Sequence, residues 1–448
     1  MRDLSGIVKA YDIRGVVGEQ IDTEVVRDLG AAFARFVGGP AVVIGYDMRD
    51  SSPALSAAFA EGVTGQGVDV VDIGLASTDM LYFASGKLEL PGAMFTASHN
   101  PAKYNGIKLC RAGASPVGQD SGLSEIRQMV EHGVPDFLGA KGSVSKRDML
   151  DGYAEYLHTL VDLSTSRPLK IVVDAGNGMG GYTVPRVFDG LPFDVVPMFF
   201  ELDGTFPNHE ANPLDPKNIV DLQAKVREVG ADVGVAFDGD ADRCFVVDAD
   251  GEPVSPSAIT ALVAVRELAK DPGGTIIHNL ITSKGVPEIV TEHGGKAVRT
   301  RVGHSFIKQT MAETGAIFGG EHSAHYYFRD FWRADSGMLA ALHVLAALGE
   351  TDKPLSDLMG QYSRYSASGE INSTVADQAG RMAAVKETFS GEGVSVDELD
   401  GLTVDLGDGS WFNLRASNTE PLLRLNIEAP TDEAVAELRD RVLAIVRG

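Results

Sequence analysis

The 448-residue chain has little cysteine and is short of basic residues. Two cysteines in a chain of this length cannot build a disulfide framework, which favours a reducing compartment. Lysine and arginine number 39 against 63 aspartates and glutamates, so the formal net charge is −24. This balance argues against nucleic acids and anionic membranes as partners, because both attract basic surfaces.

Long hydrophobic runs are also missing. No uncharged run reaches the ~20 residues that a membrane-spanning helix needs, and Met1–Ser5 does not begin a basic segment followed by an apolar core, as a signal peptide does. Hydrophobic residues make up 44% of the chain and charged residues 23%, which is ordinary for a globular protein. We therefore expect a cytoplasmic protein with no membrane partner, and its length predicts three or four domains.

Short β-branched runs recur along the chain, each followed by Gly, Asp or Ser and then by a helical pattern. They are Ala41–Gly45, Lys170–Asp174, Asp232–Phe237 and Thr275–His278. This alternation predicts an α/β fold of βαβ units with mixed, largely parallel sheets, whose sites lie at the carboxyl ends of the strands.

The last portion of the chain has a different pattern. Predicted strands at Thr403–Leu406, Trp411–Arg415 and Leu422–Glu428 precede a predicted helix at Glu433–Val446, which indicates a smaller α+β domain. The domain limits are expected near residues 155, 255 and 370. The first follows a predicted helix around Asp151–Leu160 and precedes Ser164–Pro168, the second lies near the turn-rich Gly251–Pro256, and the third follows Tyr362–Gly369. We expect three related α/β domains at 1–155, 156–255 and 256–370, and the C-terminal domain at 371–448.

Ser98 offers a hydroxyl directly after the apolar run Gly92–Ala97. Asn100-Pro101 predicts a turn at this point. The serine is then presented at a strand end, where backbone N–H groups can cradle a phosphate and Lys108 could neutralise its charge. The structural alternative is a serine or asparagine that only closes a local turn or caps a helix.

Three carboxylates, Asp238, Asp240 and Asp242, stand at alternate positions after the apolar run Val233–Phe237. Alternate residues of an extended chain point to one side, and crowded carboxylates repel unless a cation lies among them. Hard oxygen ligands suit Mg²⁺. The alternative is a solvated acidic turn, which the preceding apolar run disfavours.

Gly176–Gly181 follows the predicted strand Ile171–Asp174 and matches the Gly-x-Gly-x-x-Gly pattern, with Glu201 at the end of a later apolar run. A dinucleotide site is therefore a competing hypothesis. A tight turn between a strand and a helix needs the same glycines.

Two further loops concentrate polar groups. Gly319–His325 carries a carboxylate, a hydroxyl and two imidazoles, which suit contacts with sugar hydroxyls and proton transfer. Arg415–Pro421 combines a guanidinium, two hydroxyls and an amide, which make a phosphate receptor. The alternatives are structural histidines in the first loop and a polar hairpin loop in the second.

Four of these motifs, together with Tyr11–Gly15, resemble the α-D-phosphohexomutase family, and within it the bacterial phosphomannomutase/phosphoglucomutase branch. The four are those of Ser98, Asp238–Asp242, Gly319–His325 and Arg415–Pro421. The resemblance covers nearly the whole chain, and the motifs stand in the family's order. It implies three related α/β domains and a smaller C-terminal domain around a central cleft, each contributing one motif.

The resemblance also implies roles for individual residues. Ser98 becomes the phosphoserine, and Asp238, Asp240 and Asp242 bind Mg²⁺ together with an oxygen of Ser98 or of its phosphate. Glu321 and Ser323 contact the sugar. The non-reacting phosphate is held by Arg415, Ser417, Asn418 and Thr419. The reacting centre is lined by Arg14, Lys108, Arg243, His304 and His325. Lys284 lies where some members carry a further lysine, but it does not align well enough to join this set.

The implied reaction moves phosphate between C1 and C6 of mannose or glucose phosphate through phosphoserine. A 1,6-bisphosphate of glucose or mannose is its intermediate and activator. The expected partners are small hexose phosphates, and the expected state is a monomer or weak homodimer.

Three rival functions stay open. Phosphoglucosamine mutases typically carry Gln at the position of His322 and Ser-Gly in place of Ser323-Ala324. The second rival is a sugar-phosphate phosphatase, in which water takes the phosphoryl group. The third is a non-catalytic protein that binds sugar phosphate or nucleotide.

Overall fold

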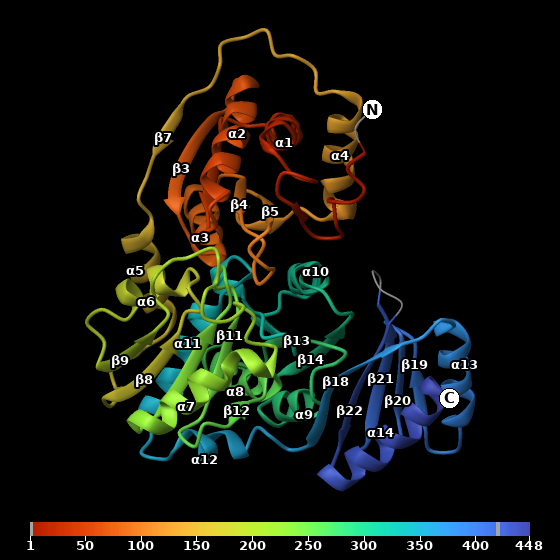
Figure 1. Cartoon of the computed structure of the whole chain (residues 1–448). Helices are drawn as coiled ribbons and strands as arrows, with labels where there is room; N and C mark the ends of the chain where they lie inside the picture. Colours follow the sequence, from red (N-terminus) through yellow and green to blue (C-terminus); the bar gives the residue numbers. More distant parts are fainter. Residues whose placement is uncertain (1–2, 418–421) are drawn as a thin grey trace. The chain divides into compact units, whose positions relative to one another are not determined.

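The computed structural model describes residues 3–417 and 422–448, apart from the side chains of residues 304 and 305. The chain packs into two compact units. The first unit contains Met1–Val254 and Ser323–Ser356, and the second contains Ser255–His322 and Asp357–Gly448. Figure 1 shows the elements of both.

The first sheet of the first unit has the strand order β1-β5-β4-β2-β3-β7, with β6 beside β5. Strands β4, β2, β3 and β7 pair in parallel, whereas β5 is antiparallel to β1 and β4. The strands are β1 (Ile13–Val16), β2 (Ala41–Tyr46), β3 (Asp69–Leu75), β4 (Gly92–Phe95), β5 (Tyr104–Arg111), β6 (Ser115–Pro116) and β7 (Val144–Lys146).

Five helices accompany this sheet: α1 (Thr23–Val37), α2 (Ser52–Gly65), α3 (Thr78–Leu88), α4 (Leu123–His132) and α5 (Leu150–Leu160). Asp22 caps α1 by accepting hydrogen bonds from the N–H groups of residues 24 and 25. Helix α1 can pack closely on α2 because Gly30 has no side chain: a Cβ there would lie 2.3 Å from the Phe59 carbonyl oxygen. Phe33, Phe59 and Phe95 fill the core between helices and sheet.

The second sheet of the first unit has the order β12-β11-β10-β8-β9. Strands β9, β8 and β10 are parallel, and β11 and β12 continue the sheet antiparallel. The elements are β8 (Leu169–Asp174), α6 (Gly180–Val187), β9 (Phe193–Met198), α7 (Val220–Val229), β10 (Val233–Phe237), β11 (Cys244–Val247) and β12 (Pro253–Val254). Residues 323–356 add β16 (Tyr326–Phe328), β17 (Ala334–Asp335) and α11 (Gly337–Gly349).

The second unit begins with a parallel group of strands in the order β14-β13-β15. Its elements are α8 (Pro256–Lys270), β13 (Thr275–Asn279), α9 (Gly285–Glu292), β14 (Lys296–Thr300), α10 (His304–Thr314) and β15 (Phe318–Gly320). Helix α12 (Leu355–Gly360) brings the chain back into this unit.

The C-terminal sheet of the second unit is antiparallel throughout, in the order β18-β22-β21-β20-β19. The elements are β18 (Ser366–Thr374), α13 (Gln378–Thr388), β19 (Ser395–Asp397), β20 (Leu402–Asp405), β21 (Trp411–Ala416), β22 (Leu422–Ala429) and α14 (Asp432–Arg447). One face of the sheet packs against α13 and α14 over a separate hydrophobic core (Figure 1).

The predicted α/β fold with mixed, largely parallel sheets is confirmed, as are the predicted strands near residues 41, 170, 232 and 275. Strand β18 was not predicted. It contains three serines and only one large apolar residue, most of its residues are at least partly exposed, and it is held by its backbone pairing with β22. It runs through residue 370, and α5 runs through residue 155, so both expected domain limits fall inside regular elements. Among the described residues no helix is both long and apolar enough to cross a lipid bilayer.

Candidate functional site

Ser98 lies in the turn that follows β4, and its side chain is 4% exposed. Its backbone adopts the left-handed conformation with φ of 50°. The hydroxyl donates a hydrogen bond to Asp238 Oδ2 at 2.8 Å and lies 3.2 Å from His99 Nδ1. Two motifs that are 140 residues apart in the sequence therefore meet at one point.

Two backbone N–H groups of the turn already donate hydrogen bonds within it. The backbone N–H of Ser98 donates to Thr96 Oγ1 at 2.8 Å, and that of Asn100 donates to the Ala97 carbonyl at 3.0 Å. The N–H groups of Ser98 and Asn100 are thus used within the turn itself.

The carboxylates of Asp238, Asp240 and Asp242 are buried, with exposures of 0%, 0% and 1%. Strand β10 is buried along its whole length, so its carboxyl end delivers these side chains into the interior. One oxygen of each lies within 4.8 Å of the others. The predicted convergence of the three carboxylates on one point is confirmed.

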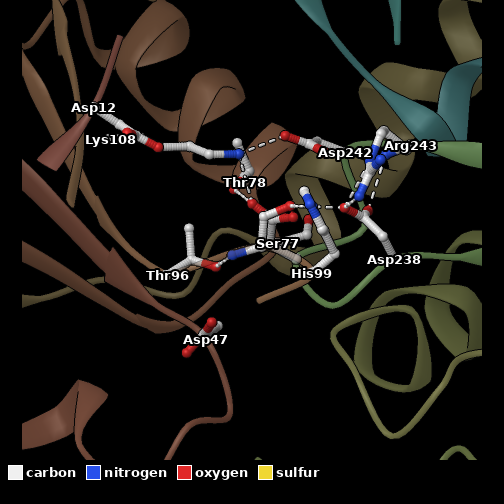
Figure 2. Close-up of polar contacts among 12 residues, drawn as sticks. Asp12, Asp47, Ser77, Thr78, Thr96, His99, Lys108, Asp238, Asp242 and Arg243 are labelled. Atoms are coloured by element: carbon white, nitrogen blue, oxygen red, sulfur yellow. Dashed lines mark hydrogen bonds and ion pairs between the residues drawn. The ribbon is translucent and has the colours of Figure 1, made fainter. Parts of the chain in front are cut away.

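Two cations compensate this charge (Figure 2). Lys108 Nζ lies 2.7 Å from Asp240 Oδ2 and 2.6 Å from Asp242 Oδ2. Arg243 Nε donates to Asp238 Oδ2 at 2.9 Å. Lys108 was expected to act on a phosphate, whereas here it bonds to the carboxylates.

The carboxylates differ in their affinity for protons. Burial raises the pKa of Asp238 to about 7, against the lowering effect of Arg243. Burial also opposes ionisation of Asp240, but the Lys108 ammonium outweighs it and holds the pKa of Asp240 below its ordinary value. The same contact holds the pKa of Lys108 well above its ordinary value, although burial acts the other way.

These residues fit a divalent cation. Asp240 Oδ1 and Asp242 Oδ1 are buried and accept no hydrogen bond from any residue that the structure describes. Oxygen atoms of this kind, fixed by Lys108 on the other side of each carboxylate, are hard ligands with unused lone pairs.

Other predicted residues surround this centre in the first unit. His325 Nε2 lies 3.8 Å from Asp242 Oδ1, and its Nδ1 lies 3.1 Å from Ser323 Oγ. Arg14 on β1 donates to Asn100 Oδ1 at 2.6 Å and also binds Asp12.

Thr78 belongs to the same centre but was not predicted. It is the first residue of α3, and its hydroxyl donates to Asp240 Oδ2 at 2.6 Å while its N–H donates to the Asp240 carbonyl at 3.0 Å. Its only sequence signal is a Ser-Thr-Asp helix start, which is common in proteins.

The other predicted residues lie in the second unit. Glu321 is 2% exposed and accepts hydrogen bonds from Asn279 Nδ2 and from the Gly303 N–H, one residue before His304. Asp400 accepts a hydrogen bond from the Val302 N–H at 3.2 Å and lies 3.8 Å from Arg415 Nη1. Asp400, which was not predicted, thus joins the loop before α10 to the end of β21.

Three predicted site residues lie wholly or partly outside the described part of the chain. His304 begins α10, but its side chain lies outside the described part of the chain, and so do Asn418 and Thr419. The Ser417 N–H donates to the Leu422 carbonyl at 2.8 Å. Lys284 pairs with Asp405 at 2.9 Å.

The glycine-rich segment Gly176–Gly181 is accounted for by packing. A Cβ at Gly178 would lie 2.6 Å from the Gly239 carbonyl oxygen, and a Cβ at Gly181 would lie 2.2 Å from that of Phe200. The Met179 N–H also donates to the Gly239 carbonyl at 2.9 Å. The glycines let this turn approach the carboxylate loop, so their pattern needs no nucleotide to explain it.

Four protein-family models match consecutive segments of the chain. They describe phosphoglucomutase/phosphomannomutase alpha/beta/alpha domain I at residues 5–134, domain II at 151–251, domain III at 255–365, and the phosphoglucomutase/phosphomannomutase C-terminal domain at 370–445.

Individual proteins are similar along nearly the whole chain. A protein of Xanthomonas campestris named phosphohexose mutases is 41% identical over 98% of this chain and 99% of its own length. A phosphomannomutase of Salmonella typhimurium is 41% identical over 97% of each chain. The crystal structure of a phosphoglucomutase/phosphomannomutase family protein from Burkholderia thailandensis superposes with a TM-score of 0.90 and 35% identity, covering 100% of this chain and 98% of that one.

Proposed function

The chain belongs to the α-D-phosphohexomutase family, and from this premise we propose that it moves phosphate between C1 and C6 of mannose and glucose phosphates. It is an isomerase-type phosphotransferase, a phosphohexomutase. The relatives named phosphomannomutase and phosphohexose mutases support both sugars as substrates.

One observation carries the proposal: Ser98 Oγ and the three buried carboxylates form a single cluster. The hydroxyl lies 2.8 Å from Asp238 Oδ2, and Asp240 and Asp242 each have an oxygen that accepts no hydrogen bond within the described part of the chain. A nucleophilic oxygen next to a cation site is what phosphoryl transfer requires.

Phosphorylated Ser98 gives its phosphoryl group to the free hydroxyl of a hexose monophosphate. The bond from phosphorus to Ser98 Oγ breaks, a bond to the sugar oxygen forms, and the hydroxyl proton passes to a base, for which His325 is our candidate. A base in this position contributes roughly 10²–10⁴-fold to the rate. The resulting 1,6-bisphosphate turns around. The bond from its other phosphorus to the sugar oxygen then breaks, Ser98 Oγ takes this phosphoryl group and gives up its proton, and the freed sugar oxygen regains a proton.

Cations of this chain stabilise the negative charge that spreads over the transferred group. We assign this role to Arg14, Lys108 and Arg243, and we assign the cation site to Asp238, Asp240, Asp242 and Ser98. Bound Mg²⁺ would supply further positive charge to the phosphoryl oxygens. We propose His304 as a further residue of the reacting centre.

The remaining assignments concern recognition. We propose that Glu321 and Ser323 contact the sugar hydroxyls, and that Arg415, Ser417, Asn418 and Thr419 hold the non-reacting phosphate. Glucose and mannose differ only at C2, so contacts with the 3- and 4-hydroxyls accept both. His322 and Ala324 depart from the phosphoglucosamine mutase pattern, which favours hexose phosphates over amino sugars.

Further parts of the proposal concern the molecule as a whole. The four matched family segments support four domains near 1–155, 156–255, 256–370 and 371–448. Cys110 and Cys244 are buried thiols, which supports a reducing, cytoplasmic setting. A monomer or weak homodimer remains our proposal for the oligomeric state.

The test is ³¹P NMR of the purified protein with Mg²⁺ and a trace of glucose 1,6-bisphosphate. Mannose 1-phosphate and glucose 1-phosphate are offered in separate tubes. We expect both to become 6-phosphates, Ser98→Ala to lower the rate by at least about 10³-fold, and the exposed-site control Ser164→Ala to behave as wild type. Removing Mg²⁺ with a chelator should stop conversion, and adding it back should restore it.

Other outcomes point to the rivals. Release of inorganic phosphate would indicate a phosphatase. No conversion in either tube, with conversion of glucosamine 1-phosphate in a third tube, would indicate the amino-sugar branch. Binding without turnover, unaffected by Ser98→Ala, would contradict an enzymatic function altogether.

A further inference from the structure

Arg49 lies directly after β2, in the loop that leads to α2, and its side chain is 1% exposed. A guanidinium so deeply buried must have its charge and its N–H groups satisfied inside the protein. It makes no hydrogen bond to the Asp238–Asp242 carboxylates among the described contacts. Its acceptors lie in the turn that carries Ser98.

Four carbonyl oxygens of that turn accept hydrogen bonds from Arg49. Nη2 donates to the carbonyls of Ser98 at 2.8 Å and Asn100 at 2.7 Å. Nη1 donates to the carbonyls of Pro101 and Tyr104, both at 3.0 Å. Nε donates to Asp47 Oδ2 at 3.2 Å. A guanidinium has five N–H groups, and each one is used.

Asp47 holds the guanidinium from the opposite side. It is 0% exposed, and its Oδ1 accepts hydrogen bonds from the Arg49 N–H at 3.0 Å and from the Ser52 hydroxyl at 2.6 Å. Ser52 in turn accepts a hydrogen bond from Asn105 Nδ2, at the beginning of β5. Both ends of the 98–104 turn are thereby tied to the loop after β2.

The guanidinium is also shielded. The ring centroid of Phe206 lies 5.1 Å from its Cζ. A Cβ at Gly204 would come within 2.6 Å of the Arg49 Cα, so this loop packs directly on the arginine. These contacts hold Arg49 in one place and exclude water from its hydrogen bonds.

The turn needs such support because its conformation is unfavourable by itself. Ser98 has φ of 50°, which L-residues with a Cβ avoid, and several carbonyl dipoles converge on one point. The direction of the Ser98 hydroxyl toward Asp238 depends on this backbone. If the carbonyls separated, the Ser98 backbone would relax and its Oγ would leave the carboxylate cluster.

We propose that Arg49 is a positioning residue for phosphoryl transfer, which holds the Ser98–Tyr104 turn through its carbonyl groups and so keeps Ser98 Oγ aimed at the carboxylate cluster. Arg49 acts through the turn and not by touching the substrate. The inference rests on the proposed mutase function.

Lysine in place of Arg49 tests the inference, because an ammonium keeps the charge but has three donors at a single point and cannot span four carbonyls and a carboxylate. We expect Arg49→Lys to lower kcat about 10²-fold, the loss that a misplaced reacting group causes. The KM for glucose 1-phosphate should stay within about threefold, because the turn holds the nucleophile rather than the sugar. Phosphorylation of Ser98 by glucose 1,6-bisphosphate, followed by intact-protein mass spectrometry, should slow by a similar factor.

Arg167→Lys is the matched control. Arg167 also clamps backbone in the first unit, donating to the carbonyls of Thr351 and Pro168 and to Asp232. It lies outside the site, so this variant should keep the wild-type kcat even where its melting temperature falls. Asp47→Asn serves as a second test if Arg49→Lys does not fold. We again expect kcat to fall while the KM for glucose 1-phosphate changes little.

The outcomes separate the two proposals. A wild-type enzyme with mutase activity and a folded Arg49→Lys variant with kcat within about threefold of it would overturn the positioning role alone. A loss that appears in KM, or equally in Arg167→Lys, would also overturn it. A wild-type protein without mutase activity would refute the proposed function and with it the inference.

Discussion

Ten residues other than glycine hold a left-handed backbone in the described part of the chain, among them Ser98 and Ala324 in loops of the proposed site. Ser98 has φ of 50° and the buried Ala324 has φ of 66°. A left-handed backbone costs an L-residue roughly 1–2 kcal/mol. Such residues persist where the surrounding structure determines them, as the Asp47–Arg49 loop does for Ser98. Alanine at position 324, where glycine would adopt this backbone freely, must therefore be held in the left-handed conformation by the residues around it.

The buried carboxyl group of Asp79 should make the stability of the protein depend on pH. Its buried carboxylate accepts hydrogen bonds from Ser77, Tyr153 and Ser336 at 2.5, 2.7 and 2.6 Å. Burial outweighs these contacts and raises its pKa from 3.8 to about 6, a preference for the protonated form of roughly 3 kcal/mol.

A carboxyl whose pKa is raised on folding stabilises the protein fully below its unfolded pKa, and this contribution is lost as pH rises through the folded value. We expect Asp79→Asn to remove this loss, so the stability of wild type relative to the variant should fall between pH about 4 and about 7. Urea unfolding across this range measures it.

The partly exposed Asp203 gives the control for this measurement. Hydrogen bonds from Thr205 lower its pKa below 3.8, so Asp203→Asn should show no change of slope in the same range. If the stability of wild type instead rose relative to that of Asp79→Asn with increasing pH, the assignment would be contradicted.

At the scale of elements, the loop between β10 and β11 is fixed by close backbone contacts on two sides. A Cβ at Gly239 would lie 2.4 Å from the Ser98 carbonyl oxygen, and one at Gly178 would lie 2.6 Å from that of Gly239. The turn before α6, the carboxylate loop and the Ser98 turn are thus stacked without room for a methyl group.

Gly178→Ala should therefore destabilise the protein by about 1–3 kcal/mol through overpacking and lower mutase activity by displacing the carboxylate loop. Gly65→Ala, at the end of α2, meets nothing within 4 Å and should be neutral or stabilise by about 0.5–1 kcal/mol. Denaturant unfolding and activity of both variants test this. Equal stability of the two would show that the loop can move to accept the methyl group.

At the scale of the whole molecule, the C-terminal sheet has its own hydrophobic core beneath α13 and α14, which includes Phe412, Leu414 and Leu425. The contacts that join it to the rest of the second unit include the pairs Lys284–Asp405 and Arg299–Asp397. Contacts of this polar kind can be replaced by water at small cost.

We therefore expect the fragment 366–448 to fold alone. It should unfold cooperatively in urea by circular dichroism, and Phe412→Ala, which removes a buried ring, should lower its stability by about 3–5 kcal/mol. The variant Glu392→Ala, at an exposed position, should leave the stability of the fragment unchanged. A fragment without a cooperative transition would show that its core depends on the rest of the chain.

The sequence by itself determined the local elements and the chemical groups. The buried strand Val233–Phe237 and the carboxylates behind it, or Ser98 behind an apolar run, are patterns within a few residues, which local propensity and burial produce directly. Strand β18 escaped prediction because its stability comes from pairing with β22, which its own mostly exposed residues do not encode.

Only the tertiary structure decided which groups meet. It directed Lys108 to Asp240 and Asp242, brought Thr78 to Asp240, joined Asp400 to Arg415, and placed four of the five donors of Arg49 on carbonyls of the Ser98 turn. Each of these contacts joins residues distant in sequence. Their geometry depends on how sheets and loops pack, because a hydrogen bond requires an approach within about 3 Å that no local pattern of residues specifies.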